Sequence, residues 1–128
     1  MDIQKAFNKH FIEFIDDIAN IFPDNVEIKT LTNALKTMRQ ANPKLIMQCW
    51  YTNIVMVYKT EIDAGDINFF ITKQYDKDLS NVKSNDTIIK GINKLREPIK
   101  LMSDSNQQKA MKYMQNLSKL SSVYYLNT

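Results

Sequence analysis

Apolar residues recur every three or four positions along much of this chain, which is the spacing of one buried face of an α-helix. The first such pattern covers residues 2–21 and consists of Ile3, Phe7, Phe11, Phe14, Ile15, Ile18 and Phe22. The segment "FPDN" ends this pattern, and a second one over about 28–41 places Leu31, Leu35 and Met38 on its inner face. These patterns predict two amphipathic helices at the start of the chain.

The stretch "NPKLIMQCWYTNIVMVYK", residues 42–59, is the most apolar part of the chain. A membrane span needs about 20 consecutive apolar residues, and this run is shorter and is interrupted by polar side chains. Its apolar residues point in nearly all directions on a helix, which is typical of a helix surrounded by others. We therefore expect a central helix over about 43–62, capped by Asn42 and ended by Gly65.

Trp50 and Cys49, the only residues of their types, both lie in this stretch. We expect both side chains to be buried. A single Cys allows no intramolecular disulfide, and no motif surrounds it, so Cys49 is expected to pack as a small hydrophobic residue.

The rest of the chain also favours helices. "DINFFITKQY" could be a helix capped by Asp66 or a short strand, and we favour the helix because no second strand is evident to pair with it. "DKDLSNVKSND" predicts an exposed loop. Helices are then expected over about 86–102, where Pro98 kinks or splits the helix, and about 105–125. The sequence thus predicts an all-α fold, a compact single-domain bundle of five or six helices over residues 1–128.

The composition limits the kinds of catalytic or binding site that the chain can form. The chain has only 2 Gly, which excludes Gly-rich phosphate-binding loops, and one Cys with one His exclude the usual zinc sites. His10 is the only candidate base for a nucleophilic triad, and nothing around any Ser resembles a nucleophile motif. These observations predict a protein that is not an enzyme and has no cofactor.

His10, Glu13 and Asp17 share one face of the first predicted helix and could in principle ligate a metal ion. Metal sites in helical bundles draw ligands from several helices, and no other His is present to complete one. We therefore interpret this cluster as a solvated polar face opposite the phenylalanines.

Charge is unevenly spread along the chain, whose net charge is +3. Residues 1–30 have a net charge of −3, from 3 Lys against 6 Asp or Glu, and residues 87–128 have +5, from 7 Lys or Arg against 2 acids. The candidate contacts for a nucleic acid or an acidic partner are Lys90, Lys94, Arg96, Lys100, Lys109, Lys112 and Lys119. Tyr113, Tyr124 and Tyr125 could stack on bases, but the scarcity of Arg argues against base recognition.

Several segments, "DIANIFPDN", "NALKTMRQANPKLI", "GDINFFITKQYDKDL", "INKLREPI" and "NQQKAMKYMQNLSKLS", together resemble a family of short uncharacterised proteins of giant nucleocytoplasmic large DNA viruses. The resemblance spans about residues 7 to 125. A composition of 15 Ile, 15 Lys and 13 Asn agrees with an AT-rich viral genome. The resemblance implies a setting in the host cytoplasm, a viral factory or the virion, and it brings no site residues with it.

From these observations we expect a non-enzymatic viral helical protein that acts through protein–protein interaction or self-association. The alternative is a small nucleic-acid-binding accessory protein that uses the lysine-rich C-terminal third. No membrane span and no small-molecule substrate are inferred, and the charged N-terminal residues indicate no secretory signal peptide.

Overall fold

The computed structural model describes residues 2–72, 90–92 and 94–126, and every element in these ranges is a helix. The elements are α1 (Ile3–Ile21), α2 (Val26–Ala41), α3 (Leu45–Trp50), the π-helix η1 (Tyr51–Val55), α4 (Met56–Ala64), α5 (Ile67–Thr72), α8 (Arg96–Lys100) and α9 (Asp104–Leu126). The all-α prediction is confirmed. None of the helices in the described ranges is long and apolar enough to cross a membrane.

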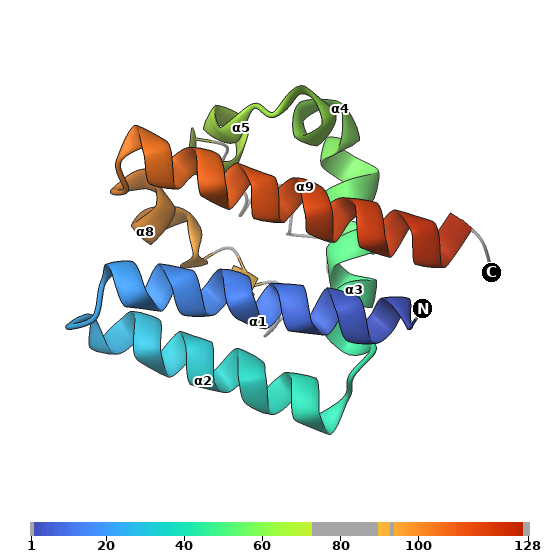
Figure 1. Ribbon diagram of the computed structural model, residues 1–128, viewed down its shortest axis with the longest axis horizontal. Helices are drawn as coiled ribbons and strands as arrows, with labels where there is room; N and C mark the ends of the chain where they lie inside the picture. Colours follow the sequence, from blue (N-terminus) through green and yellow to red (C-terminus); the bar gives the residue numbers. More distant parts are fainter. Residues whose placement is uncertain (1, 73–89, 93, 127–128) are drawn as a thin grey trace.

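Three long helices lie roughly side by side (Figure 1). α2 runs back along α1, and α9 lies on the other side of α1 in the opposite direction to it, with the most extensive helix–helix contact in the described structure. The continuous run α3–η1–α4 crosses steeply near the end where α1 begins and α9 ends, and α5 and α8 pack together nearer the other end. α9 therefore has α1 on one flank and η1 and α4 on another.

The central helix is buried at its middle, as expected. The side chain of Trp50 has no exposed surface and that of Cys49 is 2% exposed. The indole Nε1 of Trp50 donates a hydrogen bond to Ser118 Oγ of α9 at 3.0 Å, and the edge of the ring faces Phe11 of α1. These contacts tie α1, α3 and α9 into one apolar core.

The expectation that helices surround the central run on all sides is wrong at Met56 and Val57. Their side chains are 67% and 55% exposed, because they lie on the side of α4 that α5 and α9 leave uncovered. The apolar pattern of this segment thus combines a buried face with an exposed one, which periodicity does not separate when both faces are apolar.

Local hydrogen bonds place the helix ends, some of them away from the predicted positions. Asn25 Oδ1 accepts from Ile28 N at 3.0 Å, so α2 begins at Val26, two residues earlier than expected. Asn42 Oδ1 accepts from Lys44 N at 3.3 Å and closes a turn instead of capping the central helix, which begins at Leu45.

Gly65 ends α4 as predicted, with a left-handed φ of 72°. α5 confirms the helical interpretation of the described part of "DINFFITKQY", and Asp66 Oδ1 accepts from Asn68 N at its start. The last three residues of that segment, 73–75, lie outside the described residues. The predicted loop "DKDLSNVKSND" and the start of the helix predicted over 86–102 lie outside the described residues.

Pro98 marks a break in the fifth predicted helix. The described chain is helical at 90–92, turns at Leu95 and re-enters a helix as α8. Pro98 has no N–H to donate to the carbonyl of Lys94, and its ring would crowd that carbonyl in a continuous helix. In the first turn of a helix the backbone N–H groups have no carbonyl partner within that helix, so Pro98 is tolerated in the first turn of α8. The predicted helix therefore splits ahead of Pro98.

Candidate functional site

α9 has a cavity along each of two flanks. The α1–α9 pocket has a volume of about 250 Å³, and the α4–α9 groove, which η1 also lines, has a volume of about 530 Å³. Both are open to solvent. Concave sites with an apolar base and a few polar groups are where small ligands and partner side chains usually bind, so we describe each in turn.

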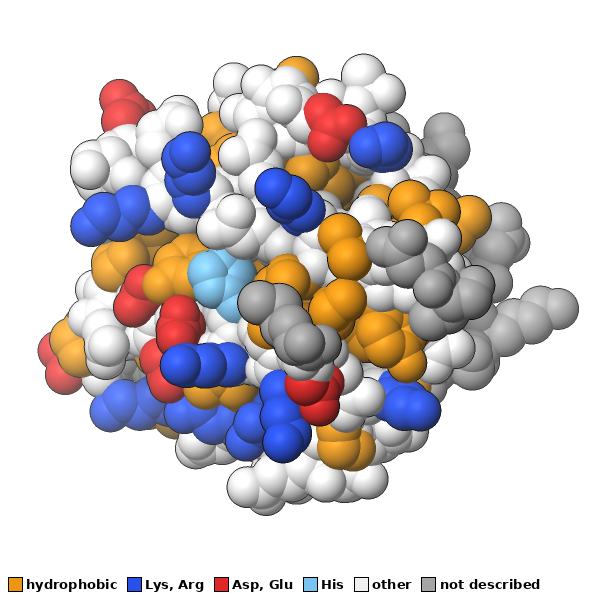
Figure 2. Space-filling model, turned by 45° about the vertical axis from the view of Figure 1, so that its right-hand side comes forward, with side chains coloured by type: hydrophobic (Ala, Val, Ile, Leu, Met, Phe, Trp, Pro, Cys, Tyr) orange, Lys and Arg blue, Asp and Glu red, His pale blue; other side chains and the backbone are white. Residues whose placement is uncertain are grey.

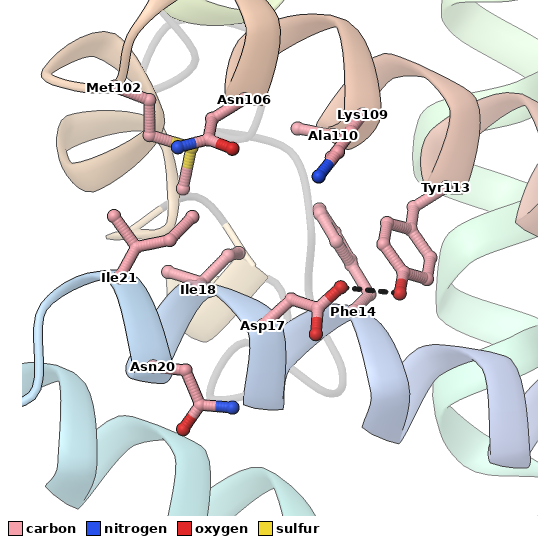
Figure 3. A pocket seen from close by; sticks show the side chains of 10 residues that line it. All are labelled: Phe14, Asp17, Ile18, Asn20, Ile21, Met102, Asn106, Lys109, Ala110 and Tyr113. Carbon is pink, nitrogen blue, oxygen red and sulfur yellow. Dashed lines mark hydrogen bonds between the residues drawn. The ribbon is translucent and has the colours of Figure 1, made fainter.

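The α1–α9 pocket lies between the second half of α1 and the first half of α9. Figure 3 shows Asp17 reaching in from α1 and Lys109 from α9, with the ring of Phe14 between them and Ile18 to one side, toward Ile21. The lining residues are Phe14, Asp17, Ile18, Asn20, Ile21, Met102, Asn106, Lys109, Ala110 and Tyr113. α1 thus contributes a negative charge to the lining of the pocket, and α9 contributes a positive charge.

Tyr113 closes one end of the pocket. Its hydroxyl donates to Asp17 Oδ2 at 2.5 Å, and its ring packs on Phe14 at 5.2 Å and on His10 at 4.8 Å between ring centroids. This hydrogen bond, with desolvation and the negative charges of Asp17 and Glu13, raises the pKa of Tyr113 from 10.0 to about 12. Tyr113 is therefore a neutral hydrogen-bond donor at physiological pH.

The interpretation of His10, Glu13 and Asp17 as a solvated polar face is wrong in part. Glu13 and Asp17 are exposed, but His10 is half-buried against Tyr113, and Asp17 is hydrogen-bonded to the same residue. The cluster helps to join α1 to α9, which the sequence could not indicate because Tyr113 is about 100 residues away. Within the described ranges, no three His, Cys, Asp or Glu side chains gather closely enough to hold a metal ion.

The α4–α9 groove is lined by apolar, charged and uncharged polar side chains, the last being Gln115, Asn116, Ser118 and Ser122. The apolar lining residues are Val55, Ile62, Val123 and Leu126, and the charged ones are Lys59, Asp63 and Lys119. Lys59 Nζ pairs with Asp63 Oδ2 at 2.9 Å, whereas Lys119 makes no such pair with a described residue. Gln115 Nε2 donates to the carbonyl of Ile62 at 2.9 Å and ties α9 to α4 beneath the groove.

The π-helix η1 supplies part of this groove. The amide of Met56 donates to the carbonyl of Tyr51, five residues back, so this turn is wider than an α-turn. Asn53 Nδ2 donates to the carbonyl of Cys49 at 3.1 Å and satisfies an acceptor at the start of the widened turn. Val55, the last residue of η1, lines the groove.

The lysines predicted on the last helix differ in their surroundings. Lys109 lines the α1–α9 pocket, Lys119 lines the α4–α9 groove, and Lys112 is exposed but lines neither. On the face shown in Figure 2, basic side chains lie above and below the histidine, with acidic and apolar side chains among them. Whether these three lysines bind a partner stays a prediction.

The remaining predicted contacts differ in exposure. Lys90, Lys94 and Lys100 are exposed, whereas Arg96 is half-buried and its Nε donates to the carbonyl of Phe70 at 2.8 Å. That bond ties α8 to α5. Whether these four side chains bind a partner stays a prediction.

The aromatic side chains proposed for base stacking are already in contact with the protein. The ring of Tyr113 packs against α1, Tyr125 stacks on Tyr51 at 4.8 Å between centroids, and Tyr124 meets Tyr125 edge to face. Their ring faces are partly occupied by these neighbours.

The sequence did not predict the groove. The only indication in the sequence is that apolar residues, Val123 and Leu126, stand near the end of the last predicted helix, and in the structure they are 39% and 74% exposed. The π-helix has no sequence signature that periodicity could detect.

Comparison of the chain with protein-family models, with curated proteins and with solved structures finds no match.

Proposed function

We propose that this protein acts by binding another protein, either a second copy of itself or a different partner, and that the α4–α9 groove is the binding surface. The observation that supports the proposal is the groove, which is open to solvent between two helices and has exposed apolar side chains in its lining, Val123 and Leu126. Grooves of this kind receive the apolar face of an amphipathic helix or the apolar side chains of a loop.

Exposed apolar side chains at the groove strengthen the proposal. Leu126 is 74% and Val123 is 39% exposed. An apolar side chain in water gains free energy when a partner covers it, and apolar side chains gathered in one concave place are typical of an interface.

A non-enzymatic role is part of the proposal. Among the described residues, each of the two cavities is lined by a single carboxylate, Asp17 in the pocket and Asp63 in the groove, and the latter is paired with Lys59. Glycoside hydrolysis, for example, uses two carboxylates at one site. This arrangement supports binding more than catalysis.

The proposal is tested by placing a charge in the groove. Leu126→Lys is expected to abolish self-association seen by size-exclusion chromatography with light scattering, or capture of a partner by the tagged protein. Because the Leu126 side chain is exposed, the melting temperature should stay nearly unchanged.

Val26→Lys is the matched control. Val26 is 75% exposed at the start of α2 and lies outside the groove, so this variant should bind as the wild type does. Equal loss of binding in both variants, or no loss in Leu126→Lys, would show that the groove is not the binding surface. The partner recovered by the wild type and the control is identified by mass spectrometry.

We also propose a viral setting, in the host cytoplasm, a viral factory or the virion. Its support is the resemblance of the segments quoted above to proteins of giant DNA viruses and the Ile, Lys and Asn bias of the chain. Quantitative mass spectrometry of purified virions and of infected cells over time tests it. Absence of the chain from both would contradict the proposal.

A further inference from the structure

We propose that the α1–α9 pocket binds a free amino acid with an apolar side chain. In this arrangement Lys109 and Asn106 hold the carboxylate of the ligand, and Asp17 holds its ammonium group. The site is separate from the α4–α9 groove, and the proposal does not depend on a protein partner.

The polar side chains of the pocket have atoms that could form further hydrogen bonds or ion pairs. The ammonium group of Lys109 and the side-chain amide of Asn106 make no hydrogen bond or ion pair with a described residue. Asp17 uses Oδ2 to accept from Tyr113, and its Oδ1 accepts from no described residue. Three polar side chains, each with at least one atom that bonds no described residue, thus line one cavity.

Lys109 and Asp17 do not neutralise each other. They line the same pocket from opposite helices, yet no ion pair joins them in the described structure. A ligand with a single charge would satisfy one of the two and meet a like charge on the other wall. A zwitterion presents a negative and a positive group a short distance apart, and so matches both walls.

The rest of the pocket is apolar. Phe14, Ile18 and Ala110 form buried walls, and the Ile21 side chain is 38% exposed at the edge. The volume of about 250 Å³ lies just below the range for drug-sized ligands, roughly 300–1,000 Å³, and suits a smaller molecule. Apolar amino acids combine this size with an apolar side chain.

Asp17 is held in place before a ligand arrives. Tyr113 holds the carboxylate of Asp17 by its hydrogen bond, and Ser103 Oγ accepts from the backbone amide of Asn106 at 3.2 Å in the first turn of α9. Because Asp17 needs little reordering, binding at this wall loses less conformational entropy than at a flexible side chain.

The test is a titration of the ¹⁵N-labelled protein by nuclear magnetic resonance with leucine, methionine and phenylalanine. Each is compared with its analogue that lacks the amino group and its analogue that lacks the carboxylate. At least one zwitterion should give saturable shifts at amides of Ile18 and Ala110. Both of its analogues should bind about tenfold more weakly or worse, because each loses a charge-assisted bond.

Three variants complete the experiment. Asp17→Asn and Lys109→Met should each weaken binding of the zwitterion by about tenfold or more, whereas Lys112→Met should leave it unchanged. Lys112 is the matched control, because it is exposed on α9 and does not line the pocket. Spectra of the free variants establish that each is folded.

Three outcomes would overturn the proposal. One is that no zwitterion gives saturable shifts. Another is that the singly charged analogues bind as well as the zwitterion. The third is that folded Asp17→Asn and Lys109→Met proteins bind as tightly as the wild type.

Discussion

Trp50 joins the apolar core to a buried polar contact. Its ring lies between α1 and α9, and its only polar atom, Nε1, donates to Ser118 Oγ, while Ser121 Oγ donates to the carbonyl of Ser118. A buried indole N–H costs free energy unless it finds an acceptor, so Ser118 supplies what the core around Trp50 requires.

Removal of this ring should destabilise the protein strongly. Trp50→Ala is expected to lower the free energy of unfolding by about 3–5 kcal/mol, the range for a buried aromatic residue. Trp50→Phe keeps an aromatic ring but loses the bond to Ser118, so its cost should be smaller, about 1–3 kcal/mol. Urea denaturation of the three proteins checks both values, and equal stability of Trp50→Ala and wild type would contradict the central position of this helix.

Tyr113 should lose its hydroxyl proton at a higher pH than an ordinary tyrosine. Its pKa is raised to about 12, so the stabilisation from its protonated hydroxyl is complete below pH 10 and is lost as the pH rises from 10 through 12. Between pH 10 and pH 12 the melting temperature of the wild type should fall further than that of Tyr113→Phe. The two proteins contain the same lysines, so deprotonation of lysine affects both of them equally. Asp17→Asn should lower the pKa of Tyr113 measured by ultraviolet absorbance, because it removes the acceptor and its charge. Parallel pH profiles for wild type and Tyr113→Phe would argue against this.

The ends of the helices show where single-sequence reasoning succeeds and where it fails. Gly65 was correctly predicted to end α4, because only a residue without a Cβ adopts φ near 72° cheaply. Asn42 and Asn25 are equally good N-caps by type, yet of the two only Asn25 caps the start of a helix. Which Asn becomes a cap depends on how the chain turns between packed helices, and the residue type does not contain that information.

Substitutions at Gly65 test this element directly. Gly65→Ala should destabilise the protein by about 1–2 kcal/mol, because the new Cβ disfavours the left-handed conformation. Gly65→Asn should cost less, since Asn tolerates that conformation. Space is not the cause, because a Cβ at this position would meet Gln115 Nε2 at 3.4 Å, an ordinary contact. Thermal melts in which Ala and Asn are equally well tolerated would show that the φ of Gly65 does not limit stability.

At the scale of the whole molecule, the sequence predicted which faces are buried better than where cavities form. The predicted inner residues Phe11, Phe14 and Leu35 are buried, since periodicity reports directly on burial. The α1–α9 pocket depends on Asp17 and Lys109 meeting across two helices that are distant in sequence. Spacing within one helix carries no information on such a meeting, so the pocket and the groove emerged only from the packing.

The packing also bears on the nucleic-acid alternative. Lys109 and Lys119 lie in different cavities, each with a carboxylate in the same lining, Asp17 and Asp63, and the ring of Tyr113 is packed against α1. A polyanion approaching α9 would therefore meet negative charges beside each of these two lysines. We expect no more than weak, non-specific retention of duplex DNA at physiological salt.

Electrophoretic mobility shifts over a range of salt concentrations check this last prediction. If the lysines did bind phosphates, the logarithm of the binding constant would fall with the logarithm of salt concentration by a slope of about −0.9 for each contact. Changing Lys109, Lys112 and Lys119 together to Glu would then abolish binding with little effect on the melting temperature, because all three side chains are exposed. Tight, salt-sensitive binding by the wild type that this triple variant loses would reverse the conclusion. The lysine-rich third would then be the functional surface, and the groove would need another explanation.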